Sequence, residues 1–348
     1  MPVDHRNNNF DCIRLVAALL VLFSHAFNTL NLPAPFLLGA DEWLTPGTLG
    51  VSVFFVISGF LISASYFNNE ADFMNYARSR VLRIFPALWV QYLFVALILG
   101  ALVSDLPARD YYRQLCHIPY FFLVPFGFRF PKLPGVFTHN IKPNFVNVNL
   151  WTLAYETSMY MVLPVIFFFS RLLKKNMLPA CTVVYGVFLF YQTGFAPVSL
   201  RSMGLIHCWT FLLGSLFYVY RESISLNMRG AVYAILLWYI GRGTSWECLT
   251  YTLSVTYLVI YAAFLPARCS VKKIGDLSYG VYLYSFPMEQ LFALRLGQHF
   301  TLFVAASLAG ALVLAALSWH GVEKRVLALK RNPGSTIPRP SSSHLRLQ

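Results

Sequence analysis

The sequence predicts an all-α integral membrane protein with about ten transmembrane helices. Of its 348 residues, 57% are hydrophobic and only 12% are charged, which is far from the composition of a soluble globular domain. Apolar runs of membrane length also recur along the chain, separated by short polar segments. The expected helices span residues 10–30, 47–67, 84–104, 149–170, 177–194, 204–220, 228–241, 247–265, 276–296 and 301–320.

The positions of the basic residues predict how these helices are oriented. Lysine and arginine are concentrated in segments that an alternating path places on one side, and that side is expected to be cytoplasmic. An even number of crossings then leaves both termini in the cytoplasm. The net charge of +13 is explained by this pattern, which also suits phosphate-bearing ligands, and no nucleic-acid partner is expected.

Two segments lie outside the predicted helices. Residues 105–148 form one long extracytoplasmic loop that is rich in aromatic residues and prolines, and loops of this length are usually functional or disordered. Residues 323–348 are basic at first and then rich in proline and serine, as in disordered cytoplasmic tails. Residues 1–322 are therefore expected to form a single membrane domain.

The first apolar run carries ionisable residues along one face. Asp11 and Arg14 stand near its cytoplasmic end, and His25 lies eleven residues beyond Arg14, or ~16 Å along a helix. Asp11 and Arg14 have the i,i+3 spacing of a structural ion pair, which is the favoured reading for Asp11. His25 could form a buried interhelical hydrogen bond, but a lone ionisable residue deep in a membrane helix favours function.

Three arginines precede the third predicted helix. Arg78, Arg80 and Arg83 lie within six residues of one another, next to a helix start. Guanidinium groups match phosphate oxygens, so this cluster is a candidate phosphate site. It is equally well explained as a topological signal of the positive-inside kind.

The fourth predicted helix brings a carboxylate into the membrane. Glu156 shares a helix face with Asn149, Thr152 and Tyr160, about two turns from the outer surface. Its depth is similar to that expected for His25, and a carboxylate beside an imidazole would orient the ring and make it a stronger base. The alternative is a structural role for Glu156 as an acceptor for tyrosine or indole donors.

Other polar positions have structural explanations. Gly59 is expected to allow close helix packing, and Asp276 to cap the ninth predicted helix. Ser58 is a possible nucleophile or hydrogen-bond donor, although small residues in membrane helices are more often packing devices. The six cysteines have no metal-ligand spacing. We expect them to be apolar packing residues, with neither a metal site nor a disulfide framework.

Taken together, these motifs resemble the acyltransferase-3 family of integral membrane acyltransferases, many of which O-acetylate bacterial surface polysaccharides. The match is closest to members that modify exopolysaccharides. Six segments carry the resemblance in the order of the family, namely Phe10–His25, Gly50–Ile62, Arg80–Pro86, Leu150–Tyr160, Ser278–Leu283 and Trp319–Lys324. One departure is Tyr284-Ser285, where many members carry a histidine.

The resemblance implies a multi-pass protein of the bacterial inner membrane that uses cytoplasmic acetyl-CoA as acyl donor and needs no metal. It implies that His25 is catalytic and that Arg14 is required, with Arg80 and Arg83 holding the CoA phosphates. It also adds weight to a catalytic role for Glu156. The acceptor would be an extracytoplasmic carbohydrate hydroxyl, and machinery of polysaccharide assembly is an expected partner.

A transporter is the alternative function from a different class. A proton-coupled exporter of a glycan or glycolipid would use His25 and Glu156 as a proton relay, and its arginines only for topology. Transporters often contain inverted repeats with broken helices, and no convincing internal repeat is present in this sequence.

Overall fold

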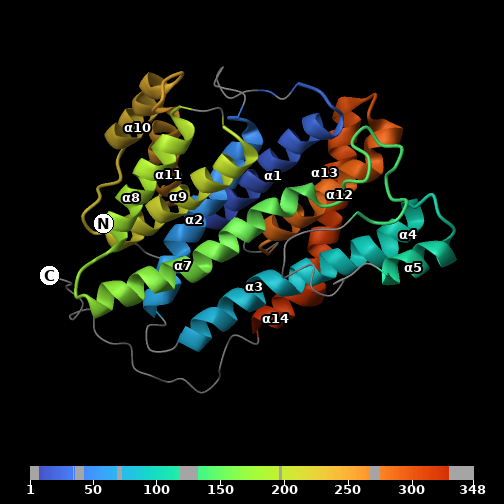
Figure 1. Ribbon diagram of the computed structural model, residues 1–348, viewed down its shortest axis with the longest axis horizontal. Coiled ribbons are helices and arrows are strands. Elements are labelled where there is room, and N and C mark those ends of the chain that lie inside the picture. The colour runs from blue at the N-terminus through green and yellow to red at the C-terminus, as the bar shows by residue number, and fades with distance from the viewer. Residues whose placement is uncertain are drawn as a thin grey trace.

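The computed structural model describes residues 8–33, 35, 43–68, 73–117, 132–195, 198–266 and 275–328. Within these ranges the chain is helical and forms no strand, which confirms the all-α prediction there (Figure 1). The helices are α1 (Phe10–Thr29), α2 (Pro46–Asn68), α3 (Phe73–Leu93), η2 (Phe94–Leu99), α4 (Gly100–Val103), α5 (Ala108–Cys116), η4 (Val148–Trp151), α7 (Thr152–Leu172), α8 (Leu178–Thr193), α9 (Leu200–Val219), α10 (Met228–Gly241), α11 (Glu247–Ala263), α12 (Ser278–Leu296), α13 (Phe300–Ser318), η5 (Trp319–Glu323) and α14 (Lys324–Ala328).

Six helical segments of the described chain are long and apolar enough to cross a membrane, judged by length and composition. The helices α8 and α10 are apolar but shorter. A helix lies in each of the ten predicted ranges, although the number of crossings and their orientation remain predictions. The six segments are Phe10–Thr29, Pro46–Phe67, Phe73–Val103, Val148–Leu172, Leu200–Val219 and Phe300–Ala328.

The helices α2 and α9 pack backbone to backbone inside the bundle, with α7 beside them in Figure 1. A Cβ atom on Gly59 of α2 would collide with the carbonyl oxygen of Phe211, and one on Gly214 of α9 with that of Val56. The prediction that Gly59 permits close helix approach is therefore confirmed. This contact holds fixed the part of α2 that carries Ser58.

The helix α1 lies against α2 and α12, and its contacts fix the relative depth of residues on all three. It runs antiparallel to α2, because Phe10 meets Phe60 while Ser24 bonds to Thr45 just before α2 begins. It runs parallel to α12, since Arg14 meets Asp276, His25 meets Phe286 and Thr29 meets Glu289. We call this line of contacts the α1–α12 interface.

Two predictions about individual residues are wrong. Asp276 does not cap α12: the N-cap position is Leu277, and no side chain caps it. Asp276 bonds to side chains of three other residues instead, as described below. Cys12 is disulfide-bonded, which its spacing from the other cysteines does not show. Cys116, Cys181, Cys208 and Cys248 form no disulfide.

Parts of two predicted segments lie outside the described residues. These are positions 118–131 of the loop predicted at 105–148, and the tail from position 329. The described part of the loop includes the short helix α5 and residues 132–147, which Gln290 of α12 holds by hydrogen bonds to the carbonyls of Lys142 and Phe145.

Candidate active site

A cavity of about 370 Å³ lies among α1, α2, α3, α7, α12 and α14. Four of the predicted site residues line it: Arg14, Arg80, Arg83 and Glu156. They come from three helices that are far apart in the sequence, so the fold gathers the predicted cationic residues around one space. Its remaining lining is mainly apolar or aromatic and includes Phe54, Phe55, Leu153, Tyr279 and Tyr282.

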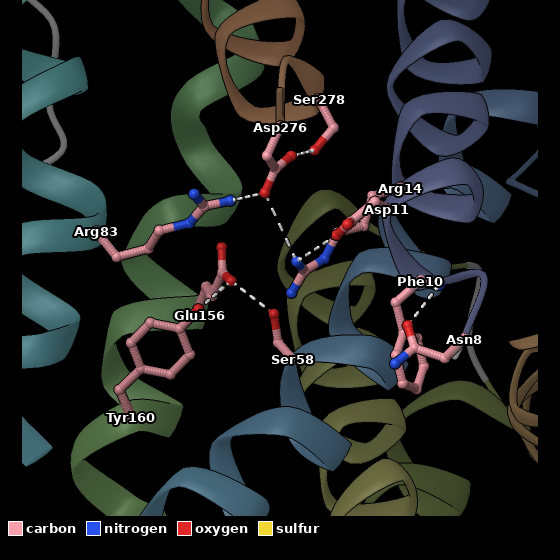
Figure 2. Close-up of polar contacts among 10 residues, drawn as sticks. All are labelled: Asn8, Phe10, Asp11, Arg14, Ser58, Arg83, Glu156, Tyr160, Asp276 and Ser278. Carbon is pink, nitrogen blue, oxygen red and sulfur yellow. Dashed lines mark hydrogen bonds and ion pairs between the residues drawn. The ribbon is translucent and has the colours of Figure 1, made fainter. Parts of the chain in front are cut away.

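Asp276 is the junction of the positive side of this cavity. Its carboxylate forms ion pairs with Arg83 and with Arg14, whose Nη1 lies 3.8 Å from Oδ2, and it accepts a hydrogen bond of 2.6 Å from Ser278 Oγ (Figure 2). Burial tends to raise the pKa of Asp276, but the charges of the two arginines and its hydrogen bonds outweigh it and lower the pKa to about 2. The carboxylate is therefore ionised and holds both guanidinium groups at the cavity.

Arg80 is positioned differently from Arg83. Its guanidinium donates to Ser79 Oγ at 3.0 Å and to Ser65 Oγ at 3.2 Å, and no carboxylate of the described chain pairs with it. Three arginines thus face two carboxylates, Asp276 and Glu156, around the cavity. The remaining positive charge can bind an anion such as a phosphate group.

Glu156 of α7 belongs to a hydrogen-bond network that reaches α2 at the cavity. Its Oε1 accepts a bond of 2.8 Å from Ser58 Oγ and another from the Tyr160 hydroxyl (Figure 2). The bond from the Tyr160 hydroxyl is the contact expected if Glu156 has a structural role as an acceptor for tyrosine or indole donors. The sequence left Ser58 as a possible nucleophile or donor and favoured a packing role, and the structure shows that it is a hydrogen-bond donor at the cavity.

His25 does not line the cavity. Its ring is half-buried and meets the ring of Phe286 edge to face, with 5.6 Å between centroids. The structure does not bring His25 and Glu156 together, since no hydrogen bond or ion pair joins them in the part of the chain that it describes.

The cavity nevertheless extends toward His25. Its lining includes Val51, and the neighbouring Gly50 packs on Ala17 and Val21 of α1. Val21 precedes His25 by one helical turn, or ~6 Å of rise. The cavity thus extends from the arginines to a residue of α2 that lies near the level of Ala17 and Val21, about one to two turns short of His25 along α1.

Glu289 was missed in the sequence. It lies in α12, is 0% exposed and accepts a hydrogen bond of 3.1 Å from Thr29 Oγ1. The sequence could have identified it, because an ionisable residue inside an apolar helix of a membrane protein is a functional candidate by default.

Comparison with known proteins decides the family. Residues 7–320 match the acyltransferase-3 family model, which is described as an acyltransferase domain. This chain belongs to the acyltransferase-3 family. With its membrane-length helices, it is a multi-pass membrane protein of that family.

Two relatives of similar length support the assignment. The chain is 30% identical over 340 residues to a protein named O-acetyl transferase from Shigella phage Sf6, covering 93% of this chain and 97% of that protein. It is also 30% identical over 358 residues to Nodulation protein 10 of Rhizobium leguminosarum bv. viciae, covering 94% of each. No solved structure matches the chain.

Proposed function

We propose that this acyltransferase-3 protein moves an acyl group, most often acetyl, from cytoplasmic acyl-CoA to a hydroxyl of an extracytoplasmic carbohydrate. An exopolysaccharide or its lipid-linked precursor is the proposed acceptor, and the bacterial inner membrane the proposed location. The observation that carries the proposal is the cavity that joins Arg14, Arg80 and Arg83 and extends along α1 toward His25.

The donor is proposed to bind with its phosphates at the arginines. Arg80 offers a guanidinium without a carboxylate partner, and Asp276 holds Arg83 and Arg14 in place. The pantetheine arm, which is long and thin, would then lie in the cavity between the aromatic side chains. Glu156 and Ser58 could hydrogen-bond the amides of this arm. We therefore propose that Glu156 helps to bind the acyl-CoA.

His25 is proposed to act as the general base. Its imidazole would take the proton from the acceptor hydroxyl while that oxygen attacks the thioester carbonyl. The bond from the carbonyl carbon to sulfur then breaks, and the departing CoA thiolate takes the proton from the imidazolium. The name of the phage relative, O-acetyl transferase, supports an acetyl group and an oxygen acceptor.

The experiment that tests this function compares the surface glycans of the host by mass spectrometry. We expect acetyl units to be lost when the gene is deleted and restored by the wild-type gene, but not by His25→Ala expressed at the same level. Unchanged glycan acetylation in the deletion strain, or full restoration by His25→Ala, would contradict the proposal.

A further inference from the structure

Glu289 is a buried carboxyl with one oxygen unused. Its side chain is 0% exposed, and Oε2 accepts the hydrogen bond from Thr29. Oε1 is shielded from solvent and has no hydrogen-bond partner in the part of the chain that the structure describes. A buried polar atom without a partner destabilises a fold, so such atoms often mark a functional group.

The neighbouring residue shows that this end of α12 has polar partners to offer. Gln290 is 1% exposed, and its amide is fully engaged: Nε2 donates to the carbonyls of Lys142 and Phe145, and Oε1 accepts from Asn140. Gln290 therefore has a structural role in anchoring residues 132–147. Glu289, one position earlier, has no such explanation for its carboxyl.

The α1–α12 interface places Glu289 next to the level of His25. His25 meets Phe286, and one turn further along each helix Thr29 meets Glu289. The surroundings are apolar, because Ala26 and Leu30 of α1 pack there with Ala293 of α12 and Phe303 of α13. Electrostatic interactions are stronger in such a setting than in water.

One face of α12 connects Glu289 with the cavity. Tyr279, Tyr282, Phe286 and Glu289 follow one another at steps of three or four residues, so they lie along one side of the helix. The first two line the cavity, the third contacts His25, and the fourth presents its carboxyl a turn beyond.

We propose that Glu289, and not Glu156, is the carboxyl that acts with His25. This inference rests on the proposed function. Glu289 is a positioning residue: after a rotation of the His25 side chain, its Oε1 accepts a hydrogen bond from one imidazole N–H and orients the other nitrogen toward the acceptor hydroxyl. The proton of that hydroxyl moves to the imidazole, whose positive charge the carboxylate stabilises until the CoA thiolate removes the proton.

The test measures acetyl-CoA binding and acetyl transfer by the full-length protein in proteoliposomes, as a function of pH. We expect Glu289→Gln to bind acetyl-CoA like the wild type and to lower kcat on the order of 100-fold. Glu289→Asp should recover part of kcat because it keeps the carboxyl. The matched control is Glu247→Gln, a buried carboxyl on α11 that accepts a bond from the Gly243 N–H, and its kcat should stay near the wild-type value.

The pH profile separates this role from a purely structural one. A carboxylate partner raises the pKa of an imidazole, and a general base loses activity as pH falls through that pKa. The acid limb of kcat should therefore move to lower pH in Glu289→Gln. The inference would be overturned if Glu289→Gln kept a kcat close to that of the wild type or left the acid limb in place. It would also be overturned if Glu247→Gln lowered kcat as much as Glu289→Gln does. Wild-type protein that transfers no acetyl group would overturn the proposed function as well.

Discussion

Nη1 of Arg14 and Oδ2 of Asp276 lie 3.8 Å apart, and the same Asp276 carboxylate is paired with Arg83. One carboxylate thus links α1, the start of α12 and α3 at the positive side of the cavity. Its side chain is only 15% exposed, so these ion pairs are screened less by solvent than surface pairs are.

We predict that Asp276→Asn weakens acetyl-CoA binding about tenfold and lowers the free energy of unfolding by about 2 kcal/mol, because it leaves two buried guanidinium groups without their shared counter-charge. Titration calorimetry and thermal unfolding of the purified protein measure the two effects. The matched control is Asp11→Asn, whose side chain is 44% exposed and lies 4.0 Å from Arg14. Its effect should stay below about 0.5 kcal/mol. Equal effects of the two substitutions would contradict the central place given to Asp276.

The ion pairs of Asp276 should persist across neutral and mildly acidic pH. Because the folded state lowers the pKa of Asp276 to about 2, its contribution to stability is complete above the pKa of the unfolded chain and is lost only as pH falls toward 2. Asp276 should therefore not titrate between roughly pH 5 and pH 8 and should cause no change of acetyl-CoA affinity in this range. A titration of Asp276→Asn gives the reference, and a wild-type affinity that collapses in this range while the variant's does not would contradict the prediction.

The bond from Ser58 to Glu156 predicts a modest effect of removing the hydroxyl. Ser58→Ala leaves Glu156 with its Tyr160 partner, so we expect KM for acetyl-CoA to rise up to about tenfold, the equivalent of one hydrogen bond. Glu156→Gln should have a larger effect on the same constant, since a neutral amide accepts hydrogen bonds more weakly than a carboxylate does. If both variants lowered kcat but left KM and the affinity for acetyl-CoA unchanged, the proposed role of Glu156 in binding acyl-CoA would be wrong.

Gly59 predicts a packing effect independent of the chemistry. An alanine Cβ there would meet the Phe211 carbonyl, which is backbone and cannot move aside alone. We expect Gly59→Ala to lower the free energy of unfolding by about 1–3 kcal/mol. Gly321→Ala is the control, because a Cβ at Gly321 meets nothing within 4 Å. Thermal unfolding in detergent measures both, and a Gly59→Ala protein as stable as the control would refute the close contact.

Several features of the fold and site could be predicted from sequence. The apolar runs predict a helix in each of the right ranges, since hydrocarbon permits little else. The start of the third helix was wrong, because α3 begins at Phe73 and the arginines predicted to precede it lie within it. Arg14 and Glu156 stand out as charges inside apolar runs, where they are costly. Arg80 and Arg83 stand out as a basic cluster whose binding role only the family resemblance implies, and the structure gathers all four residues around one cavity.

Pairing between helices could not be predicted in the same way. Counting residues from the membrane surface put Glu156 near His25, but this count assumes that all helices begin at the same depth. They do not: α2, for example, begins level with Ser24, because Gly47 packs on that residue, while α1 continues to Thr29. The partner of Arg14 and Arg83 was hidden for a similar reason, as Asp276 is 193 positions from Arg83 in the chain. Only the folded contacts reveal which helix faces which.

The central claim is that acyl-CoA binds at the arginines while His25, further along α1, takes the proton from the acceptor hydroxyl. It is tested most directly by measuring acetyl-CoA binding and acetyl transfer in matched variants. We predict that Arg80→Ala weakens binding about 10- to 100-fold, the equivalent of a charge-assisted hydrogen bond of 1.5–3 kcal/mol. Arg78→Ala, an exposed arginine on the same helix that does not line the cavity, should bind like the wild type. His25→Ala should also bind acetyl-CoA normally and yet transfer no acetyl group. Wild-type affinity in Arg80→Ala, or unimpaired transfer by His25→Ala, would contradict the account.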